Sequence, residues 1–301
     1  MSRPAFIPLI RGLPARVDGI SREKMNADPT LWANSLKKTV ELFGLDGVVA
    51  GLDFTLMAEA CGCKVIWAND RPEVLPAPGG ICEKPEETTR MKNALEAARR
   101  VFQVCRSERA CVAAITGPVT LASQLFGREE GADRIGEVKT LVVRITEAFC
   151  QIRPDVIIFM EGRPLALNEV GLPHRRIYNT LKNIVSHYDV CAGLYLQGYT
   201  TQSLGGFSQL KMDIYVLGPS LDNNLPPTSE VWALSADALG VGLSLPVDDI
   251  HKARQIIHEA EELCSSKGGR GFFLTSFGPL TRDIDLDALH QLVSEIRQVR
   301  L

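Results

Sequence analysis

The residues best suited to chemistry stand directly after short apolar segments. Asp53 follows the apolar run 47–52, and Glu161 follows Val156–Met160 and precedes Gly162–Arg163. A carboxylate in such a place can act as an acid or base, or bind a cationic or N–H-rich ligand. Two structural interpretations stand beside these: Asp53 can cap the helix that follows it, and Glu161 can pair with an arginine.

Two arginines and a glycine–proline turn offer sites for anions. Arg11 and Arg16 flank Gly-Leu-Pro-Ala after the first apolar segment, and guanidinium groups bind carboxylates through paired hydrogen bonds. The turn Thr116–Gly117–Pro118 leads into a predicted helix, whose first backbone N–H groups can receive an anionic group. The alternatives are solvated loop cations and a plain strand-to-helix turn.

The five histidines do not form a site in the sequence. His174, which follows Gly-Leu-Pro, is retained as a substrate-binding candidate, and the other four are interpreted as surface or helix-end residues. The chain has no G-x-G-x-x-G, phosphate-binding loop, G-x-S-x-G or H-E-x-x-H motif. Nucleotide-dependent phosphoryl transfer and serine hydrolysis therefore receive little support.

Eight short apolar segments, most of them separated by stretches long enough for an amphipathic helix, must position these side chains. Continuous apolar runs are typical of strands that are buried on both faces. Eight of them alternating with helices predict an α/β fold of the (β/α)8 TIM barrel class, with residues 1–301 as a single domain. Such barrels place their chemistry at the carboxyl ends of the strands. The segments are Phe6–Ile10, Gly47–Leu52, Cys111–Ile115, Val156–Met160, Cys191–Leu196, Ile214–Leu217, Gly240–Leu245 and Gly271–Leu274.

The composition excludes several classes of partner. The net charge is −3 and the sequence pI is about 6.0, so no basic excess is present to bind nucleic acid. No apolar stretch approaches the roughly 20 residues of a membrane span, and the first residues lack signal-peptide features, so we expect a cytoplasmic protein without a membrane partner. The eight cysteines are interpreted as buried thiols, and Cys61–Gly62–Cys63 lacks the spacing of a zinc ribbon.

Two stretches together resemble the uroporphyrinogen decarboxylase superfamily. One is Phe43–Val65, which contains Gly-Leu-Asp-Phe-Thr, and the other is Thr116–Gly127, which begins Thr-Gly-Pro-Val-Thr. The C-terminal segment Asp283–Leu289 is consistent with the family's closing helix. The resemblance implies a (β/α)8 barrel, in agreement with the count of apolar segments.

One branch of this superfamily removes acetate carboxyl groups from a porphyrinogen without a cofactor. The resemblance matches Asp53 to the aspartate that binds the pyrrole N–H groups there, and places Arg11 and Arg16 in the loop that binds carboxylates, with a different spacing. Gln124 stands where the decarboxylases carry a tyrosine, and their C-terminal histidine has no match around Ser276–Pro279. Decarboxylation is therefore kept as an alternative.

The other branch contains corrinoid-dependent methyltransferases, which the run Ala58–Val65 resembles more closely. Its thiol-methylating members bind zinc through a His-x-Cys after the fifth strand and a Cys near the last strand. Here the first position reads Tyr195–Leu196–Gln197 and the second reads Thr275–Ser276–Phe277, without a cysteine. We therefore predict no zinc site and no zinc-activated thiol acceptor.

The resemblance implies a zinc-independent, corrinoid-linked methyltransferase that binds no cofactor tightly. A corrinoid (cobalamin) would be its co-substrate, carried on a partner corrinoid protein. Glu161 is the expected general acid, and it lines the pocket with Tyr195 and Gln197, while Asp53 and the arginines meet the tetrapyrrole or the polar end of a small-molecule substrate. Gln124 and His174 complete the expected substrate-binding set. Some family members pair through their open faces, so the resemblance allows a homodimer, but the sequence singles out no interface and leaves the oligomeric state open. A non-catalytic tetrapyrrole-binding protein is a further alternative.

Overall fold

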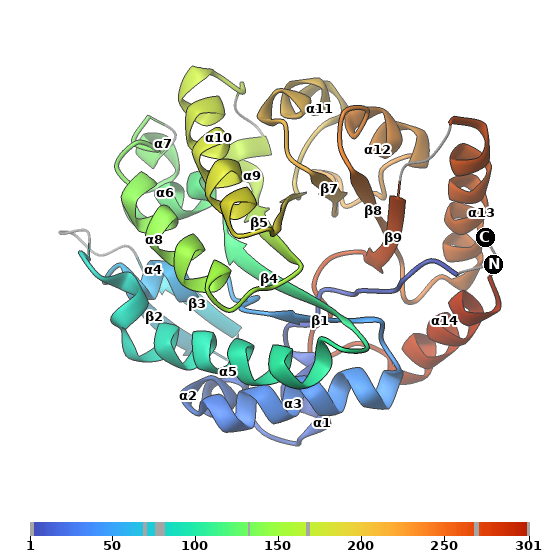
Figure 1. The fold of residues 1–301 in the computed structure, drawn as a ribbon, viewed down its shortest axis with the longest axis horizontal. Helices are drawn as coiled ribbons and strands as arrows, with labels where there is room; N and C mark the ends of the chain where they lie inside the picture. The colour runs from blue at the N-terminus through green and yellow to red at the C-terminus, as the bar shows by residue number, and fades with distance from the viewer. Residues whose placement is uncertain are drawn as a thin grey trace.

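Seven parallel strands form one curled sheet. The computed structural model describes residues 3–68, 71–75, 82–131, 133–166, 169–267 and 271–299. Within these residues each strand pairs with the next along the chain, in the order β1-β4-β5-β6-β7-β8-β9. They are β1 (Gly47–Ala50), β4 (Ala110–Thr116), β5 (Val156–Glu161), β6 (Cys191–Leu196), β7 (Ile214–Leu217), β8 (Gly240–Leu245) and β9 (Gly271–Ser276). The α/β barrel class predicted from the apolar segments is confirmed (Figure 1).

Helices connect the strands and surround the sheet (Figure 1). Asp28 accepts hydrogen bonds from the N–H groups of Thr30 and Leu31, and so caps the helix that the sequence places after it. None of the described helices is both long and apolar enough to cross a membrane. The helices are α1 (Leu13–Val17), α2 (Arg22–Ala27), α3 (Pro29–Phe43), α4 (Leu56–Ala60), α5 (Thr89–Cys105), α6 (Pro118–Phe126), α7 (Arg128–Gly131), α8 (Lys139–Cys150), α9 (Arg163–Ala166), α10 (Leu172–His187), α11 (Thr201–Phe207), α12 (Thr228–Leu234), α13 (Ile250–Lys267) and α14 (Leu286–Gln298), with 3-10 turns at Pro85–Glu87 and Ser208–Leu210.

The segment Phe6–Ile10 lies between the two edge strands of the sheet but is not the regular strand that its apolar run predicts. It forms two isolated bridges, to Leu274 and to Leu280. The N–H of Ile7 donates to the carbonyl of Leu274 at 2.8 Å, and the N–H of Asp46, just before β1, donates to the carbonyl of Phe6 at 3.0 Å. The prediction of a full strand was wrong, yet this closing segment completes the ring between β9 and β1.

A proline explains why the closing segment forms no regular ladder. Successive backbone N–H groups of an extended segment point to opposite sides, and the nitrogen of Pro8 is on the side of β1. Pro8 has no N–H to donate there. On the side of β9, the N–H of Leu9 donates to the hydroxyl oxygen of Ser276 at 3.0 Å instead of to a backbone carbonyl. Backbone pairing with β1 and with β9 is therefore interrupted in the middle of the segment, and it resumes on the second side only at Ile10, opposite Leu280 beyond the end of β9.

Three aspartates that stand directly before β1, β5 and β7 hold the amino ends of neighbouring strands together. The carboxylate of Asp155 accepts the N–H of Cys111 on β4 at 2.7 Å, and that of Asp213 accepts the N–H of Ala192 on β6 at 3.0 Å. Asp46 accepts the N–H of Phe6 at 2.8 Å in the same manner. We call Asp46, Asp155 and Asp213 the aspartate clasps.

The strand register decides which side chains face the interior of the barrel. Phe159 on β5 packs edge-to-face on Tyr178 of α10, with ring centroids 6.4 Å apart, so it faces the helices. Successive side chains of a strand point to opposite faces, and Met160 therefore faces the interior. Met160 pairs with Tyr195 of β6 in the parallel ladder, so Tyr195 faces the interior as well.

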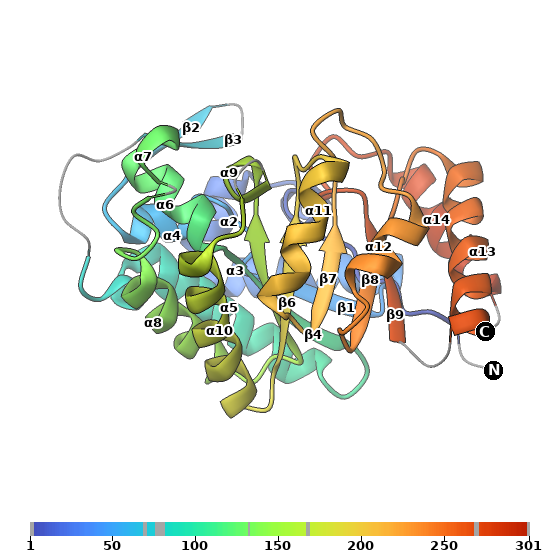
Figure 2. The ribbon, with the colours of Figure 1, turned by 90° about the horizontal axis from the view of Figure 1, so that it is seen from above.

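A two-stranded antiparallel hairpin stands above the carboxyl ends of the barrel strands (Figure 2). It consists of β2 (Lys64–Ala68) and β3 (Arg71–Leu75). The sequence predicts a strand at 64–67 and a surface excursion over 69–80, and the second strand was missed because Pro72 disfavours a strand except at a sheet edge. Residues 69–70 and 76–81 lie outside the described residues.

Candidate functional site

Asp53 lies beyond β1, enclosed by donors. The residue is 4% exposed, and its carboxylate accepts hydrogen bonds from Arg22 at 3.1 Å, from the amide of Asn26 at 3.2 Å and from Arg90. The N–H and hydroxyl of Thr55 also donate to it, at 2.9 and 2.8 Å. Burial alone would raise the pKa of Asp53, but the positive charges of Arg90 and Arg22 outweigh it and hold that pKa below its usual value.

The sequence gives no local signal for the arginine partners of Asp53 or for the aromatic ring that they contact, because these residues come from three other elements. Arg22 is on α2, Arg90 is on α5, and Trp67 is on β2 of the hairpin. Both guanidinium groups lie over the Trp67 ring, at 5.7 Å for Arg22 and 5.1 Å for Arg90. Arg90 also pairs with Glu59 of α4. The cluster thus ties the hairpin to the barrel through a buried ion pair and aromatic contacts.

Glu161 at the end of β5 is fully buried. The N–H groups of Val119 and Thr120, at the start of α6, donate to its carboxylate at 3.0 and 2.8 Å, and the hydroxyl groups of Thr120 and Tyr178 donate as well. Burial raises the pKa of Glu161, and these hydrogen bonds oppose the rise without cancelling it. Within the described residues the partners are backbone and hydroxyl groups, not the arginine that one interpretation of the sequence proposes.

The turn Thr116–Gly117–Pro118 does present N–H groups to an anion, and the anion is the chain's own Glu161. A side chain on Gly117 would overlap the Glu161 carboxylate, so glycine is needed for this approach. Glu161 shares a face of β5 with Phe159 and is bonded by Tyr178 of α10, so its carboxylate points to the helices rather than into the barrel. This geometry makes Glu161 an anchor for α6.

Tyr195 and Gln197 lie at the interior of the barrel, where β6 ends. The Tyr195 hydroxyl donates to the side-chain oxygen of Gln197 at 3.3 Å. Burial raises the pKa of Tyr195 well above its usual value, so the hydroxyl stays protonated at neutral pH. Gln197 is half-buried, and its N–H donates to the carbonyl of Glu161 at 3.1 Å, which fixes the end of β6 against the end of β5.

The arginines of the first loop take separate places. Arg11 is half-buried and lies over the ring of Phe54, 6.0 Å from its centroid. The guanidinium of Arg16 donates to the carbonyl of Arg282 at 2.9 Å and to the carbonyl of Ile284. Arg16 therefore fixes the segment before α14.

Gln124 and His174 both face other parts of the protein. The Gln124 amide on α6 donates to the carbonyl of Phe54 at 2.8 Å. His174 on α10 is 7% exposed, and its Nδ1 accepts the N–H of Gly171 at 3.2 Å. Burial lowers the pKa of His174, which keeps the ring neutral.

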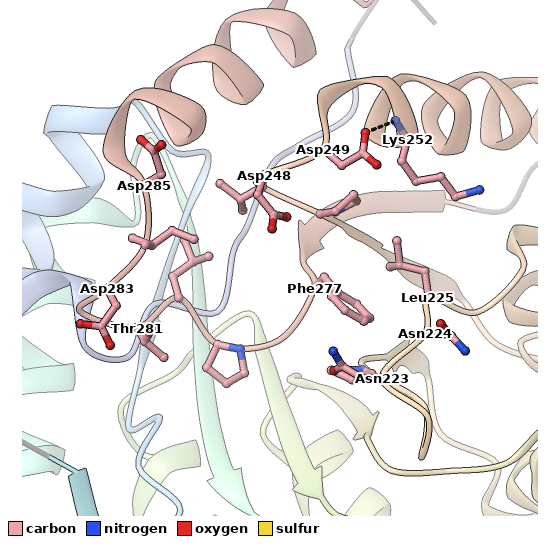
Figure 3. Close-up of a pocket in the computed structure, with 16 residues that line it drawn as sticks. Asn223, Asn224, Leu225, Asp248, Asp249, Lys252, Phe277, Thr281, Asp283 and Asp285 are labelled. Atoms are coloured by element: carbon pink, nitrogen blue, oxygen red, sulfur yellow. Dashed lines mark hydrogen bonds between the residues drawn. The ribbon is translucent and has the colours of Figure 1, made fainter.

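A cavity of about 1150 Å³ opens between the loops that follow β7, β8 and β9 (Figure 3). The aromatic side chain of Phe277 stands in it, and four aspartates and one lysine give its lining a negative charge. The sequence locates these loops as strand ends but does not single out their aspartates, because the lining is assembled from three separate loops. The polar lining residues are Asn223, Asn224, Asp248, Asp249, Lys252, Thr281, Asp283 and Asp285.

The positions where the resemblance implies zinc ligands do not fit that ion. Tyr195 and Gln197 bond to each other and offer neither a thiolate nor an imidazole. Ser276 at the end of β9 donates to the carbonyl of Gly278 at 2.7 Å and accepts from Leu9, so its hydroxyl is engaged in closing the barrel. Among the residues that the structure describes, no three His, Cys, Asp or Glu side chains gather to hold a metal ion.

The chain is thus an α/β barrel whose polar loops surround the carboxyl ends of its strands. A sequence model of the uroporphyrinogen decarboxylase (URO-D) family matches residues 11–158, which confirms the resemblance to this superfamily that the motifs indicate. A methyltransferase from Methanosarcina mazei is similar over 99% of this chain and 94% of its own, with a TM-score of 0.75 and 17% identity.

A second solved structure is also similar over the whole chain. It is a B12-independent methionine synthase from a Shewanella species in complex with selenomethionine, with a TM-score of 0.63 and 13% identity over 99% of this chain and 95% of that one. At these identities the two structures share the fold with this chain. No curated protein matches the sequence.

Proposed function

We propose that this chain is a methyltransferase that uses a corrinoid, carried on a partner protein, as co-substrate and that works without a zinc-activated thiol. The resemblance of residues 58–65 to the corrinoid-dependent branch supports this proposal, as does the likeness of the whole chain to a methyltransferase structure. The missing zinc ligands at the ends of β6 and β9 restrict the reaction to acceptors and donors that need no thiolate.

The negative charge of the cavity beside β7–β9 is the observation that favours the methyltransferase branch over the decarboxylase branch. Uroporphyrinogen is a polycarboxylate, and the lining carries Asp248, Asp249, Asp283 and Asp285 against one Lys252. Like charges repel strongly in a partly desolvated cavity. A corrinoid carries mostly neutral amides at its edge, for which the carboxylates and the amides of Asn223 and Asn224 are suitable partners. The acidic lining therefore favours a corrinoid over a porphyrinogen.

Asp53 supports the same choice. The resemblance gives this aspartate the task of binding pyrrole N–H groups in a decarboxylase, which needs free carboxylate oxygens facing the substrate. Here Arg22, Asn26, Thr55 and Arg90 already donate to these oxygens. A porphyrinogen would have to displace buried charge-assisted hydrogen bonds, which are among the strongest in proteins.

In this proposal Tyr195 and Gln197 contact the small-molecule substrate from the interior of the barrel. A bound corrinoid supplies the metal centre that takes up the methyl group. The protonated Tyr195 hydroxyl holds the side-chain oxygen of Gln197, and an N–H of the Gln197 amide can then donate a hydrogen bond to the ether oxygen or amine nitrogen that loses the methyl group. Glu161, the acid expected from the sequence, contributes by holding α6 in place.

The test is a spectroscopic titration of the metal-analysed protein with cob(I)alamin and with uroporphyrin, followed by a screen of methyl ethers and methylamines for methylcobalamin formation. We expect saturable cob(I)alamin binding, and methylation that persists with 1,10-phenanthroline present. Charge reversal by Asp248→Lys should improve uroporphyrin binding, whereas Glu41→Lys on the exposed face of α3 should not. Conversion of uroporphyrinogen to coproporphyrinogen, with no response to cobalamin, would establish the decarboxylase alternative.

One observation favours a second candidate, a non-catalytic tetrapyrrole-binding protein. Both carboxylates that the sequence singles out are fully engaged inside the protein, and neither is free to transfer a proton. Tight cob(I)alamin binding combined with no turnover of any methyl donor would support this candidate over the methyltransferase.

A further inference from the structure

Arg163 lies at the carboxyl ends of β5 and β6 and takes part in neither of the ion-pair clusters described above. Arg163 begins α9, directly after Gly162, and is exposed. Within the described part of the chain, no carboxylate or carbonyl accepts a hydrogen bond from its guanidinium. By contrast, Arg22 and Arg90 bind Asp53, and Arg16 binds two backbone carbonyls.

The stem of Arg163 is held in place, although none of the described residues binds its guanidinium head. A Cβ built on Gly198 would lie 2.5 Å from Cγ of Arg163 and 3.6 Å from its Cα and Cβ. The arginine stem therefore rests on the backbone of Gly198, which has a φ of +71° and donates its N–H to the carbonyl of Pro219 at 2.7 Å. A long side chain held along its stem loses less conformational entropy when its head binds a ligand.

The residue before Gly198 supplies a second donor group. Gln197, adjacent to Gly198 in the chain, accepts the Tyr195 hydroxyl on its side-chain oxygen, which leaves the two N–H groups of its amide for another partner. An arginine head and an amide NH₂ group provide donors and no acceptor. The group that suits them is an oxyanion, which a guanidinium binds through paired, charge-assisted hydrogen bonds.

The position of Arg163 relative to the acidic cavity strengthens this assignment. In Figures 1 and 2, α9 lies over β5, away from α13 and α14, whose amino ends border the acidic cavity. An anionic group is attracted to the β5–β6 edge and repelled from the β7–β9 edge, so the two charges together give a substrate one orientation across the mouth.

We propose that Arg163 and the Gln197 amide form an oxyanion-binding subsite, and that the small-molecule substrate carries a carboxylate or a phosphate-like group. This inference rests on the proposed function, because it concerns the substrate of the same barrel mouth. The subsite replaces the first-loop arginines Arg11 and Arg16 as the place where the chain recognises negative charge.

The experiment measures calorimetric binding of benzoate, its uncharged isostere benzamide and inorganic phosphate to the full chain, without any corrinoid. We expect benzoate or phosphate to bind saturably and benzamide not to bind. Arg163→Ala should lower the affinity about 10- to 100-fold, and Arg163→Lys should restore part of it because the charge remains without the fork. Arg99→Ala, an exposed arginine on α5, should change nothing.

Gly198→Ala is a second variant, because the added Cβ displaces the Arg163 stem without removing its charge. It should weaken the binding of the same anion, with its melting temperature recorded as a check of folding. Stronger binding of benzoate than phosphate assigns the carboxylate class, and the reverse assigns the phosphate class. Unchanged affinity in Arg163→Ala, equal binding of benzamide, or no binding of either anion would overturn the subsite. None of these results depends on methyl transfer, so failure here and failure of the proposed function are separable.

Discussion

At the level of single residues, Asp53 and Glu161 are both buried carboxylates, but their pKa values shift in opposite directions. Two guanidinium groups compensate the charge of Asp53, and they hold its pKa down against burial. The donors to Glu161 among the described residues are all neutral, so burial dominates and its pKa rises. The same side-chain chemistry thus gives a charged ion pair at one strand end and an acid that resists ionisation at another.

Replacing Asp53 should be strongly destabilising. Asp53→Asn leaves Arg22 and Arg90 without their counter-charge, and breaking a buried pair of this kind costs about 3–5 kcal/mol. Urea unfolding at pH 7 measures this loss. Because the pKa of Asp53 is lower in the folded state, its contribution is complete above its ordinary pKa and is lost as the pH falls below that value, so the difference between the two proteins should shrink in acid.

The matched control is Glu96→Gln on α5, which removes the partner that Arg99 and Arg100 share at the helix surface. Exposed pairs contribute about 0–1 kcal/mol. A similar loss in both variants at pH 7 would contradict the special role of the buried cluster.

The pH dependence of Glu161 should have the opposite sign. A raised pKa means that the folded state binds the proton more tightly than the unfolded chain, so stability falls as the pH rises above the ordinary value of 4.5. Glu161→Gln imitates the protonated carboxyl and should remove this decline. Unfolding free energies at pH 5 and pH 8 test it, with Glu41→Gln on α3 as the exposed control. A wild-type protein whose stability rises over this interval relative to Glu161→Gln would disprove the assignment.

The sequence identifies both carboxylates but cannot give their environments. Asp53 and Glu161 are found because they follow apolar runs, and that rule depends only on neighbours in the chain. Arg90 reaches Asp53 from a helix 37 residues away in sequence, which no local pattern predicts. The outward direction of Glu161 follows from the alternation along β5, but only once the position of Tyr178 is known.

At the level of elements, helix α6 begins on a carboxylate supplied by the neighbouring strand. The first N–H groups of a helix have no partner within the helix, and Glu161 satisfies two of them. The partial positive charge at the helix start adds to this attraction. The glycine before the helix lets the carboxylate approach, so the turn, the strand end and the helix form one unit.

Gly117→Ala should disrupt this unit. Its Cβ would overlap the Glu161 carboxylate, and inserting an atom into a packed site costs about 1–3 kcal/mol. Gly136→Ala is the control, because no atom lies within 4 Å of the added Cβ there. Thermal unfolding of both variants decides the matter, and equal melting temperatures would show that α6 can shift to make room.

Element prediction from the sequence succeeded where strands are buried on both faces. Seven of the predicted apolar runs are strands of the sheet. The eighth failed because the apolar pattern records burial, whereas a ladder also needs an N–H at every second residue, which Pro8 lacks. The hairpin strand β3 was missed for a related reason, since its proline is tolerated only at an edge.

At the level of the whole molecule, a small number of hydrogen bonds join the closing segment Phe6–Ile10 to the sheet, and Asp46 contributes to this closure. Its carboxylate accepts the N–H of Phe6 and binds Arg3 through both oxygens at 2.6 Å. Asp46→Ala should cost about 1–3 kcal/mol and speed hydrogen exchange at Ile7 and Leu274. Asp155→Ala, at the corresponding place on β5, should speed exchange at Cys111 instead. Faster exchange at Ile7 in both variants would mean that the ring opens as one piece.

The aspartate clasps lie at the opposite end of the strands from every proposed ligand contact. The residues that hold the strands together and the residues proposed to bind ligands are therefore at opposite ends of the barrel. Loops at the mouth can exchange a histidine for a tyrosine, or a zinc ligand for an amide, while the amino ends keep the strands in register. Such a division lets a barrel acquire a new substrate by small steps without first becoming unstable.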